Sequence, residues 1–104
     1  MEPGSIVIVH LAGPTEKYWG VLETIAVHGV TLRCLNVESF DDWTRSIAYE
    51  TSPSLGLATI FFPMGRVERM FLDERVGEVE SLRDLFERRV GRSLERYLTG
   101  GDGS

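Results

Sequence analysis

The chain has 104 residues, enough for one domain that buries about two thirds of its unfolded surface. Its net charge of −5 argues against a general affinity for polyanions, and its one cysteine, Cys34, excludes an internal disulfide. No apolar run reaches the roughly 18 residues that cross a membrane. The first residues lack the basic region of a secretory signal. We therefore expect a cytoplasmic protein without a membrane segment.

Three apolar or alternating runs predict three consecutive strands, over residues 5–11, 18–27 and 30–37. Gly20 lies inside the second run, where glycine weakens a strand unless the chain bends sharply or packs closely there. A strongly curved strand would explain it. Gly29 lies in the next turn, and we expect it to supply the positive φ that tight hairpin turns often need.

Residues 38–56 form the longest interruption of the strand pattern, too long for a plain connection in a compact domain. Phe40 and Trp43 fall at helical spacing within it, so a short amphipathic helix or an ordered excursion is expected. Residues 57–63 and 66–73 then predict a fourth and a fifth strand joined by a very short turn.

Residues 81–98 predict a C-terminal helix, with Ser81 suited to the N-cap and an apolar stripe at 3.6-residue spacing. Gly91 weakens the middle of this helix, so a kink or a restart at Ser93 is expected. The stripe has two alternative partners, the open mouth of a barrel or a neighbouring subunit. Residues 99–104 predict a flexible tail.

The order of these elements contains no repeat and no alternation of strands with helices. It predicts a mainly β fold: a five-stranded, strongly bent antiparallel barrel over residues 5–73, interrupted by the excursion at 38–56 and followed by one C-terminal α-helix at 81–98.

Two blocks of the sequence share a recognisable pattern. The first is three strands with a glycine in the second strand and an apolar residue two places later. The second is two strands joined by a very short turn, closing on an apolar residue and Asp73. The matching positions are Val7, Val9, Leu11, Gly20, Leu22, Val30, Leu32, Ile60, Phe62, Val67, Met70, Leu72 and Asp73. This pattern resembles the two motifs of the Sm-like (LSm) family, over about residues 5–37 and 57–73.

The resemblance implies an Sm-like barrel and a cyclic homo-oligomer, in which residues 57–63 of one copy pair with residues 66–73 of the next. It also implies uridine-rich RNA as a partner. The family holds uracil with an Asp and an Asn, but this chain has Ala26 and Val30 at those positions. Arg66 stands near the place of the family's second-motif cation, in a different register.

Side chains suited to catalysis are few. His10 and His28 lack the spacing of a metal site, and the adjacent carboxylates Asp41 and Asp42 point apart in any regular element. We predict no catalytic site, no metal and no cofactor, and we do not expect an enzyme.

The candidate RNA-binding residues are Arg66 and Arg69, near the turn between the last two strands, with Phe40 and Trp43 as stacking platforms for bases. The alternative is that Phe40 and Trp43 pack the excursion onto the barrel. Two functions follow: a ring that contacts RNA through a non-standard site, or a structural or protein-interaction oligomer that binds no RNA. The sequence does not give the ring size.

Overall fold

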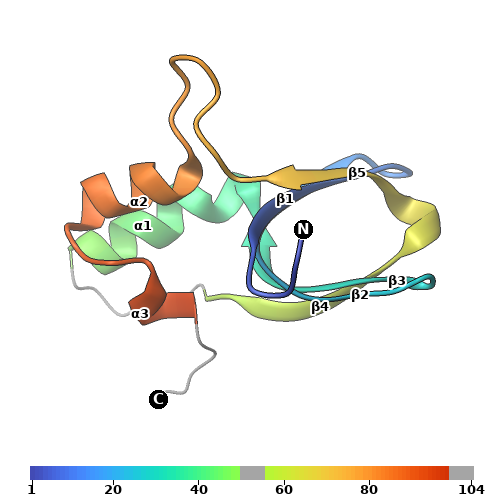
Figure 1. Ribbon diagram of the computed structural model, residues 1–104. Helices are drawn as coiled ribbons and strands as arrows, with labels where there is room; N and C mark the ends of the chain where they lie inside the picture. Colours follow the sequence, from blue (N-terminus) through green and yellow to red (C-terminus); the bar gives the residue numbers. More distant parts are fainter. Residues whose placement is uncertain (50–55, 99–104) are drawn as a thin grey trace.

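The computed structural model describes residues 1–49 and 56–98. One antiparallel sheet contains all five strands in the order β4-β3-β2-β1-β5, so the protein is mainly β (Figure 1). The strands are β1 Ile6–Leu11, β2 Glu16–Ile25, β3 Gly29–Asn36, β4 Ala58–Pro63 and β5 Val67–Leu72. The sheet is not closed, because β4 and β5 form its two edges.

Three α-helices and two short 3₁₀ helices complete the described residues. They are η1 Val37–Ser39, α1 Phe40–Ala48, η2 Met64–Arg66, α2 Leu82–Val90 and α3 Glu95–Leu98. The helix expected in the excursion is therefore confirmed as α1. The rest of that excursion, residues 50–55, and the predicted tail, residues 99–104, lie outside the described residues. In the described part of the chain, no helix has the length and apolarity needed to span a membrane.

The sheet curls, so that β5 and β4 run along opposite sides of the fold in Figure 1. Gly20 allows a close approach of β2 to β3: a Cβ atom at this position would lie 2.1 Å from the carbonyl oxygen of Arg33. It would also lie 2.5 Å from the Cα atom of Cys34. The predicted need for glycine in this strand is confirmed, because any side chain would collide with the neighbouring backbone.

Alternation along the strands creates two separate cores on the two faces of the sheet. The concave face holds the first core, made of Val7, Val9, Leu11, Leu22, Val30, Leu32, Cys34 and Phe62. On the opposite, outer face, Trp19 and Leu35 pack under the helices in a second core that also contains Phe40, Trp43, Ile47, Phe86 and Leu94.

The apolar stripe of the C-terminal helices belongs to this second core. Phe86 is fully buried, and its ring stacks on Trp43 of α1 with ring centroids 5.0 Å apart. Neither predicted partner of the stripe is therefore correct: it covers the outer face of the sheet and α1 of the same chain.

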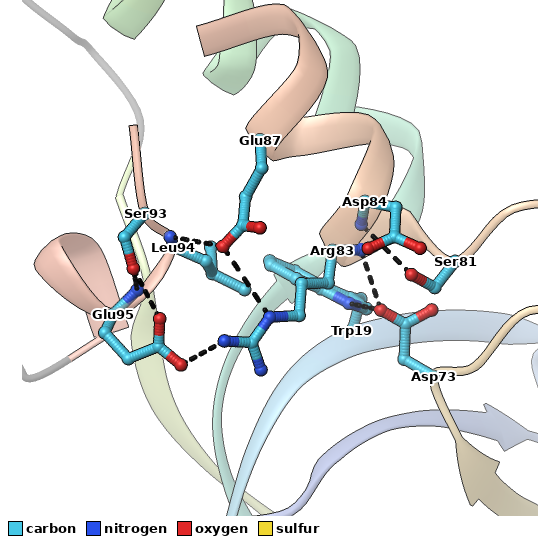
Figure 2. A network of polar contacts seen from close by, with 9 residues as sticks. All are labelled: Trp19, Asp73, Ser81, Arg83, Asp84, Glu87, Ser93, Leu94 and Glu95. Atoms are coloured by element: carbon cyan, nitrogen blue, oxygen red, sulfur yellow. Dashed lines mark hydrogen bonds and ion pairs between the residues drawn. The ribbon is translucent and has the colours of Figure 1, made fainter. Parts of the chain in front are cut away.

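Asp73 fixes the start of α2 to the sheet (Figure 2). Its carboxylate accepts hydrogen bonds from the backbone N–H groups of Leu82 and Arg83, each at 2.9 Å. It also accepts a 3.0 Å bond from the indole Nε1 of the buried Trp19. Ser81 caps the same helix, as predicted, by accepting a bond from the N–H of Asp84 at 3.0 Å.

The predicted single helix over residues 81–98 is instead two helices. Gly91 adopts a left-handed conformation with φ 76° and ends α2, since a left-handed residue cannot continue a right-handed helix. The chain restarts as α3 at Glu95, close to the predicted restart. The side chain of Glu87 bridges the break by accepting the N–H of Leu94 at 2.9 Å (Figure 2).

The role predicted for Gly29 is wrong. Its φ is not positive, and the hairpin turn is formed by Val27 and His28 between paired Ala26 and Gly29. Glycine is required there for space instead, because a Cβ atom would lie 2.3 Å from the carbonyl oxygen of Phe62.

Candidate nucleic-acid interface

A row of three nitrogen-bearing side chains crosses β2, β1 and β5. His10 lies opposite Lys17 on one side and opposite Arg69 on the other. Residues that lie opposite each other in antiparallel strands point to the same face of the sheet, with their Cβ atoms about 5 Å apart. We call Lys17, His10 and Arg69 the basic row. Lys17 and Arg69 are exposed, and His10 is partly buried.

Contacts within the basic row hold His10 in one protonation state. The Nε of Arg69 donates to Nδ1 of His10 at 3.3 Å, which requires that Nδ1 carries no proton. The imidazole also meets Phe71 edge-on, with ring centroids 5.1 Å apart. Burial, and then the positive charges of Arg69 and Lys17, lower the pKa of His10 from its ordinary value of 6.5. His10 is therefore neutral at neutral pH, with Nε2 as its donor.

Chemically, the basic row offers two exposed cations and one neutral N–H donor along one line. Phosphate groups of a single strand bind to such cations, and the affinity falls as salt rises. The row lies beside the β5 edge of the sheet, beyond which the described part of the chain places no further strand.

Arg66, by contrast, is engaged within the chain. Its guanidinium donates to the carbonyl oxygens of Ala12 and Pro14, at 3.1 and 2.6 Å, and pairs with Glu16 at 3.4 Å. These bonds tie the turn between β1 and β2 to the end of η2, directly before β5. The structure thus gives Arg66 a role in holding a turn, and of the two predicted cations only Arg69 joins the basic row.

Phe40 and Trp43 lie in the second core and are each only 3% exposed. The ring of Phe40 meets the ring of Trp19 edge-on, with ring centroids 5.2 Å apart, and the ring of Trp43 is stacked on that of Phe86. Neither ring has a free face on which a base could stack. Both residues pack the excursion onto the sheet, as in the alternative prediction.

The fold also shows where the two positions that hold uracil in the Sm-like family lie in this chain. Ala26 is exposed at the hairpin between β2 and β3, and Val30 is buried in the first core. Neither carries a polar side chain, so no uracil contact of the family's kind forms at this turn.

Lys17 and His10 are not among the RNA-binding residues that the sequence predicts. The second strand was expected to begin at residue 18, whereas β2 begins at Glu16, which brings Lys17 into the sheet. A hairpin centred on the Gly13-Pro14 turn would have paired the two residues, since they are the same number of places from its middle.

Groups able to support other chemistry are scarce in the described part of the chain. There, no three His, Cys, Asp or Glu side chains gather where they could hold a metal ion. The one cysteine, Cys34, is buried in the first core, and burial raises the pKa of its thiol to about 12.

Comparisons with known proteins leave the family undefined. No protein-family model matches the chain, and no curated protein or solved structure matches it. Function is therefore inferred from the open edges of the sheet and from the basic row.

Proposed function

We propose that this chain is an Sm-like subunit of a cyclic homo-oligomer, and that the assembled ring contacts single-stranded RNA through the basic row. The strand order, the very short connection between β4 and β5, and the close packing at Gly20 agree with the Sm-like resemblance. In this proposal the open sheet is an Sm-like barrel whose edges are completed by neighbouring copies.

The observation that carries the proposal is the pair of open strand edges. Among the described residues, β4 pairs only with β3 and β5 only with β1, so each strand leaves one row of backbone N–H and C=O groups without a partner strand there. Such edges attract other strands and are normally shielded by charge, proline or a covering element. β4 carries no charged residue, has its one proline, Pro63, only as its last residue, and exposes Phe61 to 54%.

Two different edges on one chain favour a head-to-tail contact. When β4 of each copy binds β5 of the next, every edge finds a partner once the circle closes. Closure also repeats the basic row around the assembly, so weak contacts at each row act together on one strand.

RNA binding is supported by the exposed cations of the row, against an overall charge of −5. The attraction must therefore be local, and we expect it to weaken steeply with salt. Without the family's uracil contacts, we expect no strong preference for uridine.

The test uses fluorescence anisotropy of labelled oligo-U and oligo-A RNA at low salt. The wild type should bind both, and the double variant K17A/R69A should bind at least tenfold more weakly, because two phosphate contacts per copy are lost. Arg45→Ala is the matched control, since it removes an exposed arginine from α1. No binding of either RNA by wild-type protein at micromolar concentration would rule out the RNA contact.

A second candidate function is a ring that binds a protein and no RNA. Its support is the hairpin at residues 74–80, where Val76 and Val79 are 68% and 72% exposed beside Glu78. The two valines pair with each other and form a small exposed apolar surface, which a protein partner could cover. Pull-down with and without nuclease separates the two functions, since partners bridged by RNA disappear on nuclease treatment.

A further inference from the structure

The backbone groups at the open edge of β4 belong to residues whose side chains lie on the outer face. Met64 donates its N–H to the carbonyl of His28 at 2.8 Å, so Met64 bonds toward β3. Backbone direction alternates along a strand, and the register of β4 against β3 has no shift. The N–H and C=O groups of Thr59 and Phe61 therefore face the open edge.

The open edge of β5 has the opposite arrangement. Asp73 donates its N–H to the carbonyl of Ile6 at 2.9 Å, so Asp73 bonds toward β1. The same alternation then directs the N–H and C=O groups of Met70 and Leu72 toward the open edge.

These two pairs of residues lie on different faces of the sheet. Ile60, Phe62 and Met70 pack in the first core, on the inner face. Because side chains alternate, Leu72 shares the inner face with Met70, whereas Thr59 and Phe61 point outward. Residues paired across antiparallel strands must share a face, so joining the two edges continues the outer face of β4 into the inner face of β5.

We propose that neighbouring copies join with their sheet faces reversed, with Thr59 of β4 opposite Leu72 of the next copy and Phe61 opposite Met70. This inference rests on the proposed ring and specifies its contact. Sliding the strands by two residues would set Phe61 opposite the charged Glu68 in one direction. In the other direction it would set Ile60 opposite Asp73. Each slide brings an apolar side chain against a carboxylate, which disfavours that register.

The middle of this contact, which we call the reversed seam, is apolar on both faces, whereas Thr59 and Arg69 lie toward its two ends. On one face, Phe61 meets Met70, and on the other, Ile60 comes opposite Phe71 of the next copy. Of the ten large hydrophobic side chains exposed among the described residues, six lie on β4, η2, β5 or the hairpin after it. They are Phe61, Met64, Phe71, Leu72, Val76 and Val79. The reversed seam covers three of them, Phe61, Phe71 and Leu72.

Disulfide trapping tests this contact. The variant T59C/L72C places two cysteines at a hydrogen-bonded antiparallel pair, where the Cα atoms are about 5.5 Å apart, within disulfide range. Mild oxidation should give a ladder of covalent dimers, trimers and longer chains on a non-reducing gel, because each copy uses both edges. Each single variant should give no such ladder. The native Cys34 is buried and does not compete.

The matched control is T59C/F71C, which moves one cysteine by a single residue to the other face. It should stay uncrosslinked. The pair F61C/M70C repeats the test on the next rung, should one variant fold poorly. A ladder from T59C/F71C, or an oligomer that traps neither reversed pair, overturns the reversed seam and leaves the ring standing. Wild-type protein that is monomeric by light scattering overturns both.

Discussion

At the scale of single residues, Asp73 connects the sheet to the helical layer through three hydrogen bonds. We predict that Asp73→Ala lowers the free energy of unfolding by about 2–3 kcal/mol, because α2 loses two bonds to a charged group and the buried indole of Trp19 loses its acceptor. Urea denaturation measures this. Asp73→Asn keeps an acceptor oxygen and should lose clearly less. A loss below about 0.5 kcal/mol for Asp73→Ala would contradict this role.

His10 gives a prediction about pH. Its pKa in the folded protein lies below 6.5, because burial and then Arg69 and Lys17 disfavour the charged imidazole. The unfolded chain therefore binds a proton more readily, so His10 lowers the stability as the pH falls from 6.5 toward the folded pKa.

Titration of His10 by NMR measures that pKa directly. Arg69→Ala should move it upward, because one positive charge and the bond donated to Nδ1 are both lost. It should stay below 6.5, since burial is the larger cause. An unchanged or lower pKa in this variant would show that Arg69 does not act on the imidazole.

At the scale of elements, the close approach at Gly20 controls how tightly β2 packs on β3. We predict that Gly20→Ala destabilises the fold by about 3 kcal/mol, because the added methyl collides with backbone atoms of β3, which cannot rotate away. Gly65→Ala is the control, as open space surrounds that position. Thermal unfolding of the two variants compares them. Equal melting temperatures would contradict the packing argument.

The strands were predictable because alternation and β-branched residues mark half-buried strands directly. The break at Gly91 was partly predictable, since glycine weakens a helix, but the sequence does not show that this glycine adopts a left-handed conformation. The role of Gly29 was predicted wrongly because the sequence does not show whether a glycine beside a turn is needed for a positive φ or for the space that a side chain would fill. Here glycine is needed for space, because the carbonyl oxygen of Phe62 lies where a Cβ atom would be.

The candidate site was harder to predict than the fold. Phe40 and Trp43 lie at helical spacing, which is the same for rings that pack and rings that stack on bases, and only their burial separates the two uses. Arg69 was found from its place near a turn. Lys17 and His10 join it through the register of three strands. The hairpin at Gly13-Pro14 could have paired these two residues, but the sequence does not show that β1 also pairs with β5.

At the scale of the whole molecule, the two open edges make self-assembly the central claim. A charge at the seam should block it, since burying an unpaired arginine between apolar side chains is costly. We expect Phe61→Arg to be monomeric. Val27→Arg is the matched control: it adds the same charge at a residue that is 89% exposed in the turn between β2 and β3, away from both edges.

Light scattering of the wild-type protein across micromolar concentrations tests the claim most directly. We predict one species whose mass is a fixed multiple, several times that of the single chain, and independent of concentration once formed. A closed ring has no free edge, so the species should not grow further. A mass equal to that of the single chain throughout the range would contradict the ring.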